Sequence, residues 1–300
     1  MSLESKKREF LQPETVALLN SMSIRAKMIV EGYIIGLHRS PYHGFSVEFA
    51  EHRAYGSGDE IRHIDWRLYG KTDRLYVKRY EEETNLRSQL ILDTSKSMQY
   101  TSRTITKLQY GNYLVAALSY LMINQQDAVG LSQFDDKLRS FIHPRSTPGH
   151  LNTILSRLDD NTTGKDTQIE PVLHKMAERI KKRGLIILIS DLFDKPENII
   201  SGLKHFRHNK QEVIVFHILD RKELEFDFNQ RTKFLDMETG EEITTEPWHI
   251  RSQYNNLIQD LQNYYQSECR QHRIDYVLLF TDQNLDIGLT EYLNKRKKMG

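Results

Sequence analysis

Three oxygen-bearing side chains occupy alternate positions in the segment QLILDTSKSMQY, residues 89–100. A run of aliphatic residues typical of a buried strand leads into Asp93, and Ser95 and Ser97 follow. Alternate side chains of an extended loop point the same way, so we expect these three to converge while the two intervening side chains turn away. One carboxylate and two hydroxyls are hard ligands of low total charge, which suit Mg²⁺.

Two further oxygen donors are expected at the same edge of a sheet. The apolar strand GLIILIS ends at Asp191, and the segment TTGKDTQIEP places Thr167 at the start of a helix. If the strands that carry Asp93 and Asp191 are neighbours, a divalent cation (Mg²⁺, or alternatively Mn²⁺ or Ca²⁺) between the carboxylates would remove their repulsion. The alternative for Thr167 is a helix cap, with Glu170 completing a capping box. Asp194 is expected to cap the helix that follows it.

The segment DTSKSM resembles the DxSxS signature of von Willebrand factor A-type domains. Such domains build a metal-ion-dependent adhesion site from this motif, a threonine on a second loop and an aspartate on a third. The resemblance therefore implies a metal site made of Asp93, Ser95, Ser97, Thr167 and Asp191. The chain departs from the family at the glycine pair that usually precedes the threonine, because Lys165 and Asp166 stand there.

The upstream segment from residue 40 to 84 resembles the signature of the bacterial DUF58 family, which carries such a domain. Its matching residues are Gly44, Glu48, Phe49, Arg53, Tyr55, Gly58, Asp59, Arg62, Ile64, Asp65 and Trp66. Members of that family often accompany MoxR-type AAA+ ATPases. The resemblance implies a chaperone-like adaptor that uses its metal to bind a protein partner, with an acidic residue of the partner completing the metal's coordination shell.

Composition excludes several other classes of function. The formal net charge of +1 gives no case for nucleic acid as the main partner. A single cysteine, Cys269, allows no internal disulfide and fits a reducing compartment. The longest apolar stretch, YLVAALSYLMI, is shorter than the roughly 18–20 residues that a membrane span requires. The charged N-terminus is not that of a signal peptide, so we expect a cytoplasmic protein without a membrane span.

The expected fold is α/β. Residues 1–87 are predicted to form a helix, over 13–31, and a small, mainly antiparallel β module. Residues 88–300 alternate strands and helices, which predicts a von Willebrand factor A-like, open, mostly parallel sheet with helices on both faces. One antiparallel strand pair is expected within that sheet, and a hairpin insertion near 225–246.

Two other functions compete with a non-enzymatic adaptor. A Mg²⁺-dependent phosphotransferase or phosphatase of the haloacid dehalogenase type also places an aspartate at the end of its first strand. That chemistry usually needs a second acid two residues later, where this chain has Ser95, and no lysine has a diagnostic placement. The remaining alternative is a scaffold whose metal site is degenerate. The sequence has no Gly-rich phosphate loop, so nucleotide energy would come from a partner.

Overall fold

The computed structural model divides the chain into two compact units, residues 37–85 and a larger unit of residues 1–36 with 86–300. The described residues are 12–19, 21–37, 52–54, 56, 66–78, 86–159, 169–235 and 242–299. In the smaller unit, strands β1 (His52–Ala54) and β2 (Tyr76–Lys78) pair antiparallel, with helix α4 (Trp66–Thr72) between them in sequence. Most of the GDEIRHIDW motif lies outside the described residues.

The N-terminal segment forms two helices, α2 (Pro13–Ala17) and α3 (Met22–Leu37), where we expected one helix over 13–31. The break follows from local hydrogen bonds: the Ser21 hydroxyl accepts from the Ile24 amide, and the Arg25 guanidinium donates to carbonyls of residues 17 and 19.

Helix α3, except for its last residue, belongs to the larger unit. The sequence had instead placed it in an N-terminal domain of residues 1–87. The Tyr33 hydroxyl lies 3.2 Å from the Thr290 hydroxyl, and the Arg25 guanidinium lies 5.2 Å from the centre of the Tyr113 ring. Apolar side chains of α3 are buried in this unit, and such packing supplies most of the stability of a helix in a protein.

The described residues of the larger unit form a six-stranded sheet in the order β10-β7-β6-β3-β4-β5. All neighbours are parallel except β4 and β5, which pair antiparallel. The strands are β3 (Arg87–Asp93), β4 (Ala128–Phe134), β5 (Leu138–Arg145), β6 (Leu185–Ser190), β7 (Glu212–Leu219) and β10 (Asp275–Phe280). The predicted open, mostly parallel sheet with one antiparallel pair is confirmed.

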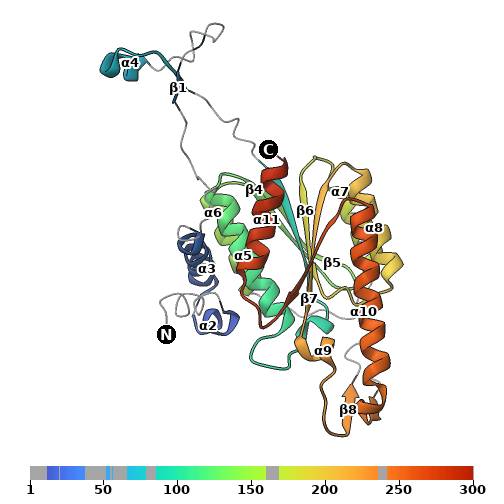
Figure 1. Ribbon diagram of the computed structural model, residues 1–300. Helices are drawn as coiled ribbons and strands as arrows, with labels where there is room; N and C mark the ends of the chain where they lie inside the picture. Colours follow the sequence, from blue (N-terminus) through green and yellow to red (C-terminus); the bar gives the residue numbers. More distant parts are fainter. Residues whose placement is uncertain are drawn as a thin grey trace. The chain divides into compact units, whose positions relative to one another are not determined.

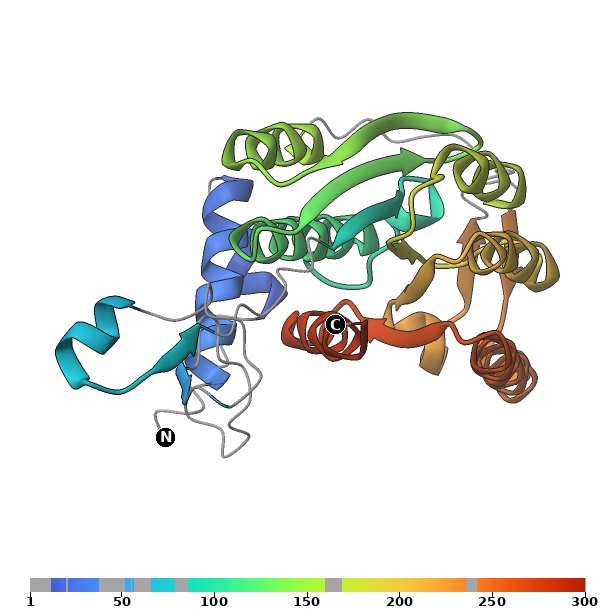
Figure 2. The same ribbon diagram turned by 90° about the horizontal axis from the view of Figure 1, so that it is seen from above.

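Helices cover both faces of this sheet, as Figures 1 and 2 show. Helices α7, α8 and α10 lie on one face, and α5 and α11 lie on the other. The bounds are α5 (Lys107–Asn124), α6 (Pro148–Asp159), α7 (Ile169–Arg179), α8 (Pro196–His208), α9 (Arg221–Glu225), α10 (Pro247–Gln271) and α11 (Asp286–Met299). No described helix is long and apolar enough to cross a membrane.

The predicted hairpin insertion is present as strands β8 (Thr232–Leu235) and β9 (Glu242–Thr245), which pair antiparallel. The predicted turn at residues 239–240 lies outside the described residues. Aromatic contacts attach the hairpin to α10, because the Phe226 ring stacks on both Phe234 and Tyr254.

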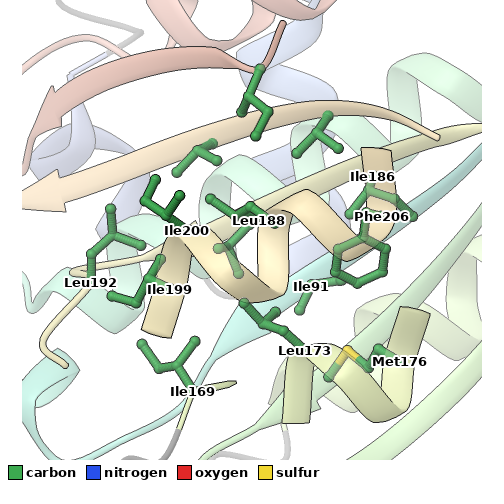
Figure 3. Packing of buried hydrophobic residues seen from close by; sticks show 14 of the residues in the cluster. Ile91, Ile169, Leu173, Met176, Ile186, Leu188, Leu192, Ile199, Ile200 and Phe206 are labelled. Atoms are coloured by element: carbon green, nitrogen blue, oxygen red, sulfur yellow. The ribbon is translucent and has the colours of Figure 1, made fainter. Parts of the chain in front are cut away.

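The core on one face is a continuous aliphatic layer between the sheet and helices α7 and α8 (Figure 3). Ile91 of β3 and Leu188 of β6 meet Leu173, Ile199 and Phe206 of the helices, and all five are fully buried. Burying each such side chain stabilises the fold by roughly 1.5–3 kcal/mol. The core therefore holds β3 and β6 rigidly side by side.

The strand order reverses direction between β3 and β6. From β3 the chain proceeds outward through β4 and β5, and it then returns to β6 and proceeds outward through β7 and β10. In open α/β sheets, ligands bind beyond the carboxyl ends of the strands at such a switch point. Asp93 ends β3 and Asp191 follows β6, so both stand at the switch point of this sheet.

Candidate functional site

The carboxylate of Asp93 is fully buried at the end of β3 and is held from two sides. The Ser95 amide donates to Oδ1 at 2.9 Å, and the Ser190 hydroxyl donates to Oδ2 at 2.6 Å. Ser190 is the last residue of β6, the neighbouring strand, so its hydroxyl joins the two strands across the switch point. Each oxygen keeps a lone pair beyond these hydrogen bonds, which leaves Asp93 able to bind a cation.

Ser95 and Ser97 come together as expected, but through a turn and not through an extended loop. Their hydroxyl oxygens lie 3.0 Å apart. Lys96 has helical backbone angles and residues 97–99 form a single 3-10 turn, so the chain bends back after Ser95. The two hydroxyls therefore lie together as predicted, although the reason given for it was wrong. Thr94 faces away, toward β4, where its hydroxyl donates to the Phe134 carbonyl at 2.8 Å.

Asp191 directs its two carboxylate oxygens to different environments. Oδ2 accepts from the Lys107 ammonium at 2.8 Å. Oδ1 is buried and accepts no hydrogen bond from any described residue. A buried carboxylate oxygen without a donor is costly, and it is the kind of atom that a bound cation would satisfy.

The loop that carries Asp191 is fixed by several contacts. Leu192 has a left-handed backbone with φ of 54°, an uncommon conformation for a branched side chain. Its amide donates to the Ser190 hydroxyl at 2.9 Å, and its carbonyl accepts from the Tyr265 hydroxyl at 3.3 Å. Surrounding hydrogen bonds thus hold the strained residue in place, and with it the direction of the preceding carboxylate.

His217 of β7 holds the backbone of the same loop. Burial lowers the pKa of His217 to about 4, so the imidazole is neutral near pH 7. One ring nitrogen, Nε2, lies 2.9 Å from the Asp191 carbonyl, and the other, Nδ1, lies 2.6 Å from the Tyr276 hydroxyl. A neutral ring satisfies both contacts when Nε2 carries the proton and donates to the carbonyl, while Nδ1 accepts from tyrosine.

Among the described residues, the site holds more carboxylates than positively charged side chains. Burial, followed by the charge of Asp191, raises the pKa of Asp93 to about 7. Burial lowers the pKa of Lys107, but Asp191 and Glu223 raise it by more, so the lysine is charged. Burial raises the pKa of Glu223 against the opposing effect of Lys107. The three carboxylates therefore share a single ammonium, and Lys107 takes up part of the charge of Asp191.

Thr167 lies outside the described residues, so its predicted roles as ligand and as helix cap stay predictions. The described chain resumes at Ile169, whose amide donates to the Asp194 carboxylate at 3.0 Å. Asp194 therefore holds the start of α7, and the prediction that it caps the following helix was wrong; α8 has Lys195 at its cap position and no side-chain cap. This contact joins the loop after β6 to the segment two residues beyond Thr167.

The donors that the described residues bring together fit a hard divalent cation. The Asp93 carboxylate, two hydroxyls and the free oxygen of Asp191 are all oxygen ligands. Within the described ranges, no three His, Cys, Asp or Glu side chains form a metal-binding group, so a cation here would rely on hydroxyls and water for part of its coordination. Such a mixed set suits Mg²⁺, which usually retains water molecules.

Sequence reasoning missed four residues of this site: Lys107, Ser190, His217 and Glu223. A serine directly before an aspartate at a strand end was a usable signal for Ser190. The others gave none, because a lysine or glutamate near a helix start and a histidine inside a strand are usually assigned to solvent and core. Only the packing of α5 and β7 against β6 brings Lys107 and His217 to Asp191.

Two mycobacterial proteins are similar to this chain over most of its length. Uncharacterized protein Rv1480 of Mycobacterium tuberculosis strain H37Rv is 22% identical over 231 residues, which cover 76% of this chain and 72% of the relative. Uncharacterized protein Mb1516 of Mycobacterium bovis matches to the same extent.

Among solved structures, an aerotolerance-related membrane protein from Bacteroides fragilis is similar with a TM-score of 0.49 and 15% identity, over 70% of this chain and 99% of that one. The VWA domain of SpRpn10 is similar with a TM-score of 0.41 and 12% identity, over 69% and 94%. The family model described as "Protein of unknown function DUF58" matches residues 51–264. Because that match spans more than half of the chain, the chain belongs to the DUF58 family.

Proposed function

We propose that this protein is a non-enzymatic, metal-dependent adaptor that binds another protein through a divalent cation at the switch point. One observation carries the proposal: Asp93 and Asp191 stand at the ends of neighbouring strands, and Asp191 keeps a buried oxygen, Oδ1, that accepts no hydrogen bond from a described residue. Mg²⁺ is the preferred cation, with Mn²⁺ or Ca²⁺ as substitutes. When bound, it would supply an open coordination position for an acidic side chain of the partner.

In this proposal each side chain has a distinct task. Asp93 supplies a fully buried carboxylate, and Ser95 and Ser97 supply neutral oxygens, so the site under-neutralises a divalent cation. Asp191 contributes through Oδ1, while its other oxygen stays on Lys107. A cation left with excess positive charge attracts a carboxylate from outside, which makes the interaction selective for an acidic partner.

The expected partner is a MoxR-type AAA+ ATPase, and the expected role is assembly or maturation of client proteins. Both come from the DUF58 resemblance. The absence of a Gly-rich phosphate loop in the sequence supports a division of labour in which the ATPase supplies the energy. Cytoplasmic localisation stays a prediction on the same footing.

The residues around Asp93 favour the adaptor over a haloacid dehalogenase-type enzyme. That chemistry usually needs a second acid two residues after the nucleophilic aspartate, and Ser95 stands there. Asp93 itself has no exposed surface. The purified protein should therefore show no Mg²⁺-dependent hydrolysis of a phosphomonoester such as p-nitrophenyl phosphate, and sustained turnover that is lost in Asp93→Asn would favour the enzyme instead.

A co-purification experiment tests the adaptor directly. The tagged chain is used to capture a MoxR-type ATPase of its own organism, with Mg²⁺ or with EDTA. We expect capture in Mg²⁺, loss in EDTA, and loss in Asp93→Ala. Thr94→Ala is the matched control, because Thr94 is adjacent and equally buried but faces β4. Capture that is unchanged in EDTA would remove metal from the mechanism.

A further inference from the structure

Lys107 is a buried cation at the centre of the candidate site. Its ammonium lies 2.8 Å from Asp191 Oδ2 and 2.7 Å from Glu223 Oε1, and only 3% of its side chain is exposed. We infer that Lys107 is a resident counter-ion, which neutralises Asp191 while no metal is bound and competes with a divalent cation for the charge of that carboxylate. This inference rests on the proposed metal site and concerns how its occupancy is set.

The position of Lys107 at the start of its helix is unfavourable for a buried cation unless the two carboxylates stabilise it. Lys107 is the first residue of α5, directly after the Thr106 cap, whose capping box with Gln109 fixes where the helix begins. A helix N-terminus carries partial positive charge and favours acidic side chains. Burying an ammonium there costs free energy from both the helix dipole and desolvation, so the two carboxylates must offset it.

Glu223 is placed so that it shares this ammonium with Asp191. Its Oε2 accepts from the Asp220 amide in the capping box of α9, which fixes the side chain and leaves Oε1 for Lys107. Lys107 therefore gives only part of its charge to Asp191. Glu223 acts as a positioning residue that moderates how strongly the lysine holds the metal-binding carboxylate.

The geometry allows a metal ion and the Lys107 ammonium to be present together, but each weakens the binding of the other to Asp191. Lys107 occupies Oδ2 of Asp191 and leaves Oδ1 without a donor among the described residues, so a cation is not sterically excluded. The ammonium and a divalent cation would nevertheless be held by one carboxylate and repel each other. Removing the ammonium leaves three unpaired carboxylates, which raises the attraction for a metal and lowers the stability of the metal-free state.

Two substitutions on the same ion pair should act in opposite directions. In Lys107→Met, the metal-free protein loses stability, and the Mg²⁺ concentration that gives half of the maximal stabilisation falls by about tenfold or more. In Glu223→Gln, all of the lysine's charge falls on Asp191, and the half-saturating Mg²⁺ concentration rises by about tenfold. Lys175→Met, at an exposed position on α7, is the matched control and should leave both quantities unchanged.

The experiment is thermal unfolding of the full chain, first stripped with EDTA and then titrated with MgCl₂ alone. Opposite shifts of the Mg²⁺ midpoint in the two variants support the inference, because a purely structural ion pair would lower stability in both without such a reversal. A midpoint in Lys107→Met equal to or higher than that of the wild type overturns it. If Lys107→Met does not fold, an unchanged or lower midpoint in Glu223→Gln overturns it instead.

Failure of the proposed metal site is distinguishable from failure of this inference. If neither the wild type nor any variant responds to MgCl₂, the metal site itself is wrong and the inference falls with it. If the wild type responds and Lys107→Met responds equally, the metal site stands and only the role of Lys107 is overturned.

Discussion

Ser190 is the residue whose loss should most directly loosen the switch point. Its hydroxyl donates to Asp93 Oδ2 at 2.6 Å and accepts from the Leu192 amide at 2.9 Å, in a fully buried position. The substitution Ser190→Ala removes both contacts while keeping the backbone and most of the side-chain volume. We expect a clear loss of stability, because two polar groups are left buried without this partner.

The magnitude follows from the two contacts. A hydrogen bond to a charged group is worth about 1.5–3 kcal/mol, and a buried amide left unsatisfied costs about 1–3 kcal/mol. Burial and the charge of Asp191 raise the pKa of Asp93 to about 7, so near neutral pH this carboxyl is partly protonated and its bond is toward the weaker end. The sum is about 2.5–4.5 kcal/mol, which corresponds to a fall in melting temperature of roughly 5–18 °C for a domain of this size.

Urea unfolding in EDTA, followed by fluorescence, measures this change, and Ser119→Ala is the matched control. Ser119 is also a fully buried serine, but its hydroxyl has no hydrogen-bond partner among the described residues. Replacing it with alanine in helix α5 should leave stability unchanged or raise it slightly, since alanine is the better helix former. If Ser190→Ala costs no more than Ser119→Ala, Ser190 does not hold the two strands' ends together and the described geometry of Asp93 is wrong.

Other parts of the fold give two further predictions. Gly202→Ala should destabilise the protein by about 1–3 kcal/mol in urea unfolding, because the new Cβ would lie 2.7 Å from Leu173 Cβ where α7 and α8 meet. The control is Gly149→Ala in α6, whose Cβ meets nothing within 4 Å and which should be neutral or stabilising. Equal effects of the two substitutions would refute the close approach of α7 and α8. Burial raises the pKa of the Cys269 thiol to about 12. The native protein at pH 8 should therefore resist thiol-reactive reagents until urea unfolds it. Rapid labelling of Cys269 without denaturant would contradict the packing of α10.

The strands of the large sheet could be predicted because their patterns are local. An aliphatic run leads into Asp93, and the strand before Asp191 is apolar as a strand covered on both faces must be; the two strands proved to be neighbours. The alternation of strands and helices predicted the parallel sheet, and the short gap between AVGLSQF and KLRSFIH predicted its one antiparallel pair. Two local errors remained: the helix expected over 13–31 is divided by the Ser21 cap, and the loop expected to be extended turns at Lys96.

What the sequence could not give is the set of contacts made between distant segments. Lys107 precedes Asp191 by 84 positions and Glu223 follows Lys107 by 116, and no pattern near any of them indicates that they meet. Asp194 was assigned to the nearest helix in sequence, but its carboxylate accepts from the first amide of α7, at Ile169. Such pairings depend on which helices pack over the switch point. That packing is determined by the hydrophobic core as a whole and not by a local sequence pattern.

The most direct test of the proposed site is to locate a metal in it. Crystals of the protein grown with Mn²⁺, whose anomalous scattering identifies it, should show one strong peak at the switch point, about 2.0–2.3 Å from a carboxylate oxygen of Asp93 and the hydroxyls of Ser95 and Ser97. Oδ1 of Asp191 should face the peak directly or through a water molecule, with Oδ2 still on Lys107. If crystals grown in saturating Mn²⁺ show the metal only elsewhere, or show none between the ends of β3 and β6, the proposed site is wrong.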